Sequence, residues 1–134
     1  MKQSIFRFSN PTLLDVRFEK NRQFKLGSKA KINLDFQTRI NKKGDEHEAV
    51  VELTVKIGET SEGCPFVISI TEGARFLWGD ISDDVADSLL AQNAPALLLG
   101  YIRPVVASLT ASSSLPAYNI PFIDFTDGTI SIDE

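Results

Sequence analysis

The residues that could do chemistry are few in this sequence, and they do not converge on a reaction. The chain of 134 residues has one histidine, His47, and one cysteine, Cys64. His47 lies beside a predicted hairpin loop, and no cysteine is near enough in sequence to suggest a ligand set, so a solvated surface histidine is the better interpretation. Cys64 has no second thiol to pair with and is interpreted as a small packing residue. Neither residue predicts a catalytic or metal site.

Four acidic residues, Asp80, Asp83, Asp84 and Asp87, are the other group that could hold a cation. Their spacing does not match an EF-hand loop, and the start of a helix explains the first three of them. The sequence also contains no phosphate-binding loop, no dinucleotide fingerprint and no G-x-S-x-G nucleophile turn. We therefore expect a protein that is not an enzyme and that uses no metal and no cofactor.

Length and composition are those of one soluble domain covering residues 1–134. Hydrophobic residues make up 43% of the chain and charged residues 24%, which is typical of globular proteins. The lone cysteine and the absence of an apolar signal-peptide core in Met1 to Asn10 indicate a cytoplasmic protein. The most apolar stretch, Ala94 to Leu109, is too short for a membrane span and is interrupted by Arg103 and Pro104. No membrane insertion is expected.

Charge is unevenly distributed along the chain. Residues 1–43 contain 11 Lys and Arg against 3 Asp and Glu, whereas residues 44–134 contain 3 against 15. A basic segment is one sign of a nucleic-acid-binding surface. Here the basic residues alternate with apolar ones in a strand-like pattern and can face acidic neighbours after folding. We therefore expect no nucleic-acid partner.

Alternation of apolar and polar residues predicts four antiparallel strands before the first helix. The first strand is expected to bend or bulge around Asn10 and Pro11. The second and third form a hairpin whose loop is expected to place Arg39 opposite Glu48. The fourth spans Pro65 to Phe76, and Trp78 follows it, either as a core residue or as the wall of an apolar binding groove.

Two helices are predicted after the sheet, which gives an α+β fold. Asp80 or Ser82 can cap the first helix, which is expected to end near Gln92. Asn93 can cap the second helix, in which Pro104 predicts a kink or a local break. The segment after this helix is expected to be irregular and to pack onto the rest of the molecule.

The second helix is apolar around nearly its whole circumference, so one sheet does not account for all of its surface. We expect a partner subunit or a bound polypeptide to cover the rest, and we expect a homo-oligomer, most simply a tetramer. The interface residues predicted on this basis are Phe66, Ile68, Ile70, Ile102, Val105 and Val106.

Three segments of the sequence resemble the SecB-like family of small chaperones. Pro95 to Arg103 (PALLLGYIR) and Leu115 to Phe125 (LPAYNIPFIDF) are similar to the long helix and the tail of that family. Leu14 to Glu19 (LDVRFE) is similar to the end of its first strand. The resemblance covers most of the chain and is strongest after Cys64.

The resemblance implies a four-stranded antiparallel sheet with two helices, assembled as a dimer of dimers whose helices lie between the sheets. It also implies an apolar groove that holds unfolded polypeptide clients without ATP. The groove residues implied are Phe24, Leu26, Trp78, Leu98, Leu115, Tyr118 and Phe122. Asp15 and Glu19 match acidic positions that family members offer to the SecA motor.

Three functions remain open from the sequence. The first is an ATP-independent holdase that can serve protein export with SecA. Some SecB-like proteins instead protect the antitoxin of a toxin–antitoxin pair, and this is the second. The third is a structural or adaptor oligomer without chaperone activity, whose apolar surface is filled by self-association.

Overall fold

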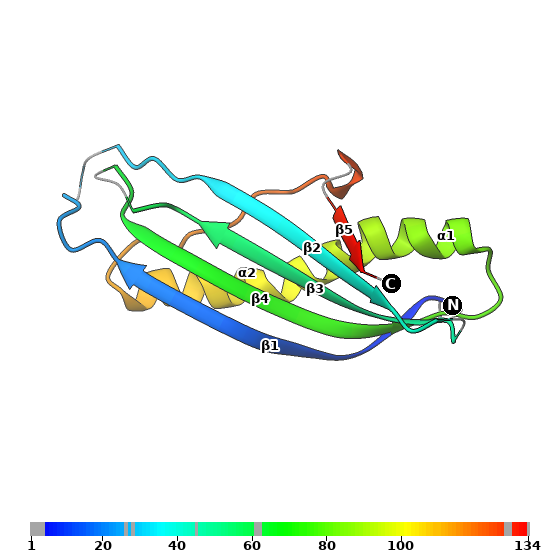
Figure 1. Cartoon of the computed structure of the whole chain (residues 1–134). Helices are drawn as coiled ribbons and strands as arrows, with labels where there is room; N and C mark the ends of the chain where they lie inside the picture. The colour runs from blue at the N-terminus through cyan, green and yellow to red at the C-terminus, as the bar shows by residue number, and fades with distance from the viewer. Residues whose placement is uncertain are drawn as a thin grey trace.

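The chain folds as a long twisted sheet with one helical segment packed along one of its faces (Figure 1). The computed structural model describes residues 5–25, 27, 29–44, 46–60, 63–127 and 130–133. The main strands are β1 (Arg7–Lys20), β2 (Leu34–Lys42), β3 (Glu48–Ile57) and β4 (Phe66–Leu77). The predicted four-stranded antiparallel sheet and the α+β class are confirmed.

A fifth strand, which the sequence pattern did not indicate, extends the sheet beyond β2. β5 (Ile130–Asp133) pairs in parallel with β2, so the order across the sheet is β1-β4-β3-β2-β5. The segment after the helices was expected to be irregular, and it is so until a short 3-10 turn, η2 (Phe125–Asp127). β5 covers the β2 edge, whereas β1 remains the other edge of the sheet.

The first strand contains the irregularity that Asn10 and Pro11 predicted. Asn10 has a φ of 54°, and the pairing of β1 with β4 shifts between Ser9 and Thr12 and again between Leu13 and Asp15. The expected bulge is confirmed. Bulges bend a strand and re-aim the residues beside them.

The register of the β2–β3 hairpin differs from the prediction. Arg39 pairs with Glu52, not with Glu48. The turn is longer than expected because Gly44 and His47 both adopt positive φ angles, of 59° and 53°. The charges on this hairpin still face opposite charges across the two strands, as predicted.

The two predicted helices are joined into one helical segment. Ser82 caps α1 (Asp83–Ser88) by accepting a hydrogen bond from the Val85 amide at 3.3 Å. Instead of a break, a π-helical turn, η1 (Leu89–Asn93), leads directly into α2 (Ala94–Ser112). Asn93 has helical backbone angles, and its side chain makes no capping hydrogen bond. Leu90 and Ala94 are fully buried and hold this stretch onto the rest of the fold. A π-type turn absorbs the change of register without ending the helix.

No local break occurs at Pro104, since α2 is assigned as continuous through that residue. Proline has no backbone N–H, so Pro104 cannot donate to the carbonyl of Gly100, four residues earlier. Gly100 is exposed, so water can bind that carbonyl instead.

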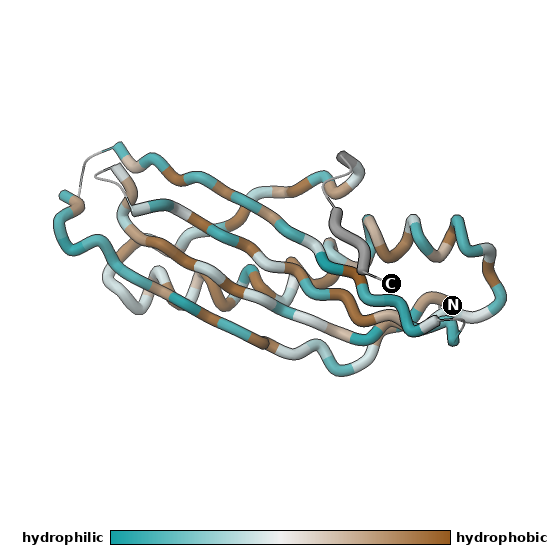
Figure 2. The backbone as a smooth tube through the Cα atoms, viewed as in Figure 1, coloured by the Kyte–Doolittle hydropathy of each residue, from teal (hydrophilic) through white to brown (hydrophobic). Residues whose placement is uncertain are grey.

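The core lies between the helix and the inner face of the sheet, whose apolar residues are coloured brown in Figure 2. Alternate residues of β3, from Ala49 to Ile57, have no exposed surface. α2 packs mainly on β4 and β3. Its buried apolar positions include Leu98, Leu99, Ile102 and Val106.

This packing corrects the predicted oligomer interface. Phe66, Ile68, Ile70, Ile102 and Val106 are at most 2% exposed within a single chain. Such side chains have no surface left for a second subunit, because the helix lies along the inner face of its own sheet. Val105 alone of the predicted set is only partly buried.

By length and composition, the joined helix Asp83–Ser112 is long and apolar enough to cross a membrane. The shorter stretch Ala94 to Leu109, considered from the sequence alone, did not indicate this. A core helix of a water-soluble protein passes the same test. Here the apolar stripe of α2 packs on β3 and β4 of its own chain.

One buried carboxyl leads to a prediction about stability and pH. Glu72 on β4 is 4% exposed, and burial raises its pKa. A folded-state pKa above the unfolded value means that the stability linked to this group is present at low pH and is lost as the pH rises through the folded pKa. Glu72→Gln is therefore expected to increase the free energy of unfolding at pH 7.

The check is urea denaturation of both proteins at pH 7 and at a pH below the ordinary glutamate value of 4.5. The difference should shrink at the lower pH, where the carboxyl is neutral in both states. A Gln variant that is less stable at pH 7 than the parent would contradict the proposed desolvation of Glu72.

Candidate functional site

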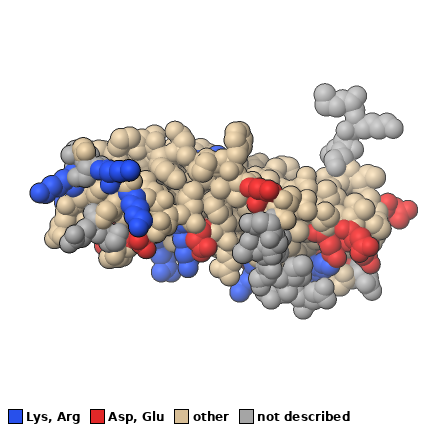
Figure 3. Space-filling model, turned by 90° about the horizontal axis from the view of Figure 1, so that it is seen from above, with Lys and Arg blue, Asp and Glu red and all other residues tan. Residues whose placement is uncertain are grey.

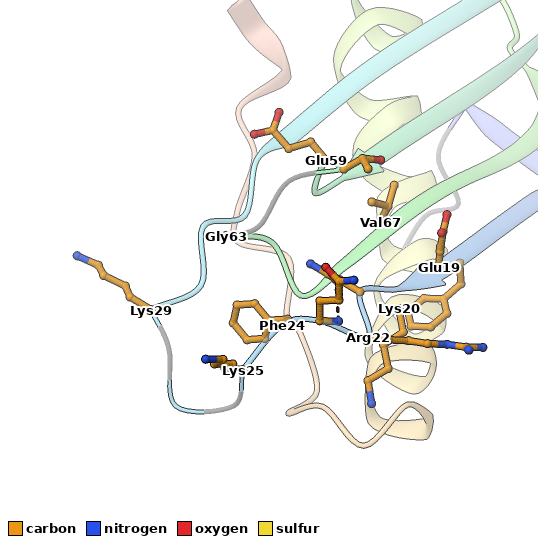
Figure 4. Close-up of a pocket in the computed structure, with 13 residues that line it drawn as sticks. Glu19, Lys20, Arg22, Phe24, Lys25, Lys29, Glu59, Gly63 and Val67 are labelled. Carbon is orange, nitrogen blue, oxygen red and sulfur yellow. Dashed lines mark hydrogen bonds between the residues drawn. The ribbon is translucent and has the colours of Figure 1, made fainter.

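An open hollow of about 1010 Å³ lies at the end of the sheet where β1 finishes (Figure 4). We call it the crossover groove, because the connection from β1 to β2 forms much of its wall. Its lining residues are Phe18, Glu19, Lys20, Asn21, Arg22, Gln23, Phe24, Lys25, Lys29, Glu59, Thr60, Gly63 and Val67.

Backbone hydrogen bonds tie the crossover to the neighbouring β3–β4 turn near both of its ends. The Asn21 amide donates to the Pro65 carbonyl at 2.9 Å, and the Lys31 amide donates to the Gly63 carbonyl at 2.8 Å. Both ends of the crossover are thereby anchored, and Phe24, Lys25 and Lys29 between them line the hollow.

The side chain of Asn21 fixes the first turn of the crossover. Its Nδ2 donates to the Cys64 carbonyl at 2.9 Å, and its Oδ1 accepts from the Gln23 amide at 3.0 Å. Its own carbonyl accepts from the Phe24 amide at 3.2 Å. An asparagine that caps its own turn in this way needs no regular secondary structure around it. The arrangement places Phe24 at the groove.

Apolar side chains continue beside the groove. Phe24 and Leu115, both half-buried, share an adjoining hollow of about 320 Å³. Phe18 stacks on Phe66 with ring centroids 6.4 Å apart, and Phe66 meets Tyr118 edge-on at 5.9 Å. Burial raises the pKa of Tyr118, so its phenol stays protonated at neutral pH. The groove therefore offers an apolar surface beside a polar rim.

α2 holds the segment that carries Leu115 and Tyr118. Thr110 is buried, and its Oγ1 donates to the Val106 carbonyl at 3.0 Å and accepts from the Tyr118 amide at 2.8 Å. About two turns earlier on the helix, Arg103 donates to the carbonyls of Ile120 and Pro121 at 3.2 and 2.8 Å. These bonds fold the chain back along α2 and fix the apolar residues beside the groove.

The structure brings together three of the predicted groove residues, Phe24, Leu115 and Tyr118, at this one end. Leu98 is not with them, since it is fully buried in the core and cannot line a groove. Phe122 is fully exposed and has the Arg103 guanidinium 5.9 Å from its ring centre. Leu26 lies outside the described residues.

Trp78 lies at the opposite end of the sheet, where β4 finishes (Figure 1). Its ring is 6.5 Å from that of Phe6 and 5.9 Å from that of His47, with which it stacks. Trp78 is half-buried, and its indole N–H has no hydrogen-bond partner among the described residues. It belongs to an aromatic cluster separate from the crossover groove. His47 is exposed, as predicted, although it also packs on this indole.

Asp15 and Glu19 lie on β1 with exposed side chains. Asp15 is 3.4 Å from the guanidinium of Arg17, in an exposed ion pair that contributes little to stability. Glu19 lines the crossover groove.

Asn21 and the basic rim of the groove were not among the predicted site residues. The signal available in the sequence was the run of basic residues between Lys20 and Lys31, which alternation with apolar residues had seemed to explain. The rim cations are Lys20, Arg22, Lys25 and Lys29.

Comparison with known proteins agrees with the resemblance seen in the sequence. Residues 3–127 match the family described as preprotein translocase subunit SecB. The chain belongs to the SecB family. The SecB family is a chaperone family and not an enzyme family, and the predicted family membership is confirmed.

Two SecB relatives give the scale of the similarity. The protein-export protein SecB of Alcanivorax borkumensis is 27% identical over 130 residues, which cover 92% of this chain and 83% of that protein. The SecB of Marinobacter nauticus is 29% identical over 100 residues, which cover 72% of this chain and 59% of that protein.

A solved SecB-like structure supports the fold. The SecB-like chaperone of Mycobacterium tuberculosis, solved in complex with a peptide from an antitoxin, superposes with a TM-score of 0.73 at 17% identity. The match covers 88% of this chain and 90% of that chain. This SecB-family chain thus shares its fold with a chaperone whose bound peptide belongs to an antitoxin.

Proposed function

We propose that this SecB-family chaperone is an ATP-independent holdase that keeps unfolded polypeptide in the crossover groove. The observation that carries the proposal is an open hollow of about 1010 Å³ beside the half-buried side chains of Phe24 and Leu115. A hollow that joins apolar side chains to a few polar groups is the usual form of a ligand-binding site.

The physics of the groove suits unfolded clients. Apolar burial is non-directional and contributes about 25 cal/mol per Å² of apolar surface removed from water. Any client segment with suitable apolar side chains can therefore bind, whatever its sequence. The affinity for each segment is modest, because the client loses chain entropy when it is held.

We also propose that the protein is a homo-oligomer joined through β1. This strand is an edge of the sheet, and it exposes Leu13 by 44%, Leu14 by 52% and Phe8 by 43%. An edge strand with apolar side chains and free backbone groups is a template for another strand. A second copy of the chain supplies one, and a second contact through Val105 and the exposed Tyr101 on α2 would complete a dimer of dimers.

Export is the first candidate role, with clients delivered from the cytoplasm. The support for a contact with SecA is limited to the exposed positions of Asp15 and Glu19 on one strand. Protection of an antitoxin is the second candidate, favoured by the solved SecB-like chaperone that holds an antitoxin peptide. Both roles use the same groove, and they differ in the client.

Replacing the apolar contacts of the groove should weaken client binding without unfolding the protein. Phe24→Ser with Leu115→Ser removes two half-buried apolar side chains, and we expect at least about tenfold weaker binding, since each is worth about 1.5 kcal/mol or more when a client buries it. Co-elution of a labelled, permanently unfolded protein on a sizing column measures the binding.

The matched control is Val85→Ser, which removes an apolar side chain that is 48% exposed on α1, away from the groove. It should bind clients as the parent does. Unchanged binding by the groove variant would overturn the placement of the site. An intact oligomer that retains no client at all would favour the structural or adaptor function.

A further inference from the structure

Charge is unevenly distributed over the surface as well as along the sequence. On the face shown in Figure 3, a group of Lys and Arg lies at the end of the molecule that contains the crossover, and a group of Asp and Glu lies at the end where α1 lies, with charges of both signs between them. The acidic residues near that second end include Asp80, Asp83, Asp84 and Asp87 on and just before α1.

The crossover groove itself is basic. Its lining contains four cations, Lys20, Arg22, Lys25 and Lys29, which are all exposed. Among the described lining residues, the carboxylates are Glu19 and Glu59.

These cations stand around an apolar centre. Figure 4 shows Lys25 and Lys29 on the crossover to one side of Phe24, and Arg22 to the other side. The site therefore combines one apolar contact with positive charges on both of its flanks.

We propose that the crossover groove selects apolar client segments that are flanked by acidic residues. The inference rests on the holdase function proposed above and names its class of client. The apolar part of the segment covers Phe24 and Leu115, while carboxylates before and after it face the rim cations. Charges act over about 8 Å at physiological ionic strength, so flanking residues feel the rim without direct contact.

A second copy of the chain is the other occupant that charge would allow, because its acidic α1 end could meet this basic end. Such a head-to-tail contact would give a closed ring or an open filament, depending on the rotation between copies. The cations also surround a hollow with apolar side chains, which suits an extended segment better than the end of a folded helix. We therefore assign the groove to the client.

Peptides with one apolar core and three kinds of flank test the proposal. The flanks are Asp, Asn or Lys, and fluorescence anisotropy measures binding to the intact protein. We expect the Asp-flanked peptide to bind about tenfold more tightly than the Lys-flanked one, as several weak exposed ion pairs would produce. The preference should fade between about 0.01 M and 1 M salt, as the screening length falls from about 30 Å to about 3 Å.

Charge reversal at the rim locates the effect. Lys25→Glu with Lys29→Glu should abolish or invert the preference. The matched control is Arg7→Glu with Lys43→Glu, which changes the net charge equally at the opposite end of the sheet and should keep the preference. A preference that survives in the rim variant would overturn the proposal.

The peptides also separate the two proposals. Binding of the Asn-flanked peptide without any effect of flanking charge would overturn the acidic-client inference and leave the holdase function standing. Failure of all three peptides and of an unfolded protein to bind would overturn the holdase function itself. A rim variant that binds all peptides as the parent does but loses its oligomeric state in sedimentation would assign the basic end to a second copy.

Discussion

Gly58→Ala is expected to destabilise the protein by about 3 kcal/mol or more, a loss in the severe range for a single substitution. Gly58 has a φ of 80°, where a residue with a side chain is strained. A Cβ at this position would overlap the Phe66 carbonyl oxygen and lie 2.7 Å from Cys64 Sγ. The Gly58 amide also donates to the Asn33 carbonyl at 2.8 Å, so the backbone cannot move freely away. This contact joins the end of β3 to the crossover that frames the groove.

Gly44→Ala is the control for backbone strain alone. Gly44 has a φ of 59° in the β2–β3 turn, and a Cβ there would meet nothing within 4 Å. We expect a loss of about 1 kcal/mol, the cost of a left-handed conformation for alanine. Urea denaturation of both variants gives the comparison. Equal losses in the two variants would show that Gly58 is needed only for its φ angle and not for the close approach.

Leu13→Asp with Leu14→Asp is expected to convert the proposed oligomer into a folded monomer. Two carboxylates placed at the β1 edge would be buried without partners if a second chain covered that edge, and each costs several kcal/mol in an interface. In the isolated chain the same positions are 44% and 52% exposed, so the fold should tolerate the change. Light scattering after size exclusion measures the mass, and circular dichroism checks that the monomer is folded.

Val85→Asp is the control for the edge variant. Val85 is 48% exposed, but it lies on α1 and not on the edge strand. It should leave the oligomer unchanged. A Leu13 and Leu14 variant with the mass of the parent would show that β1 is not the contact. If the parent protein is itself monomeric at micromolar concentration, the proposal of an oligomer is wrong.

The inner face of the sheet could be predicted because a strand has a period of two. Val51, Leu53, Val55 and Ile57 alternate with polar residues in the sequence, and all four are fully buried. The bulge at Asn10 could be predicted for a similar reason, since the residue tolerates positive φ and a proline follows it. These features depend only on local chemistry.

The predicted interface failed because composition does not say what covers an apolar surface. Ile68 on β4 and Ile102 on α2 look the same in sequence whether they meet each other or another chain. The sheet is long enough to cover the buried stripe of the joined helix, so both are fully buried within one chain. Ile68→Asp would consequently unfold the protein rather than dissociate it.

The crossover groove could be predicted only in part. Phe24 was named through the family resemblance, but the segment around it has no period that would locate it in space. Asn21 positions this segment through hydrogen bonds to the Gln23 amide, two residues away, and to the Cys64 carbonyl, which is 43 residues away in the sequence. Trp78 was grouped with Phe24 through the same family resemblance, whereas the length of the sheet separates them.

The central claim, that the protein holds unfolded chains without nucleotide, is tested most directly by light scattering. A denatured, slow-folding protein is diluted into buffer containing this chain, with and without ATP, and its aggregation is followed over time. The account predicts that aggregation is suppressed at stoichiometric amounts and that ATP makes no difference. Aggregation that proceeds unchanged in the presence of the intact oligomer, or suppression that appears only when ATP is added, would contradict it.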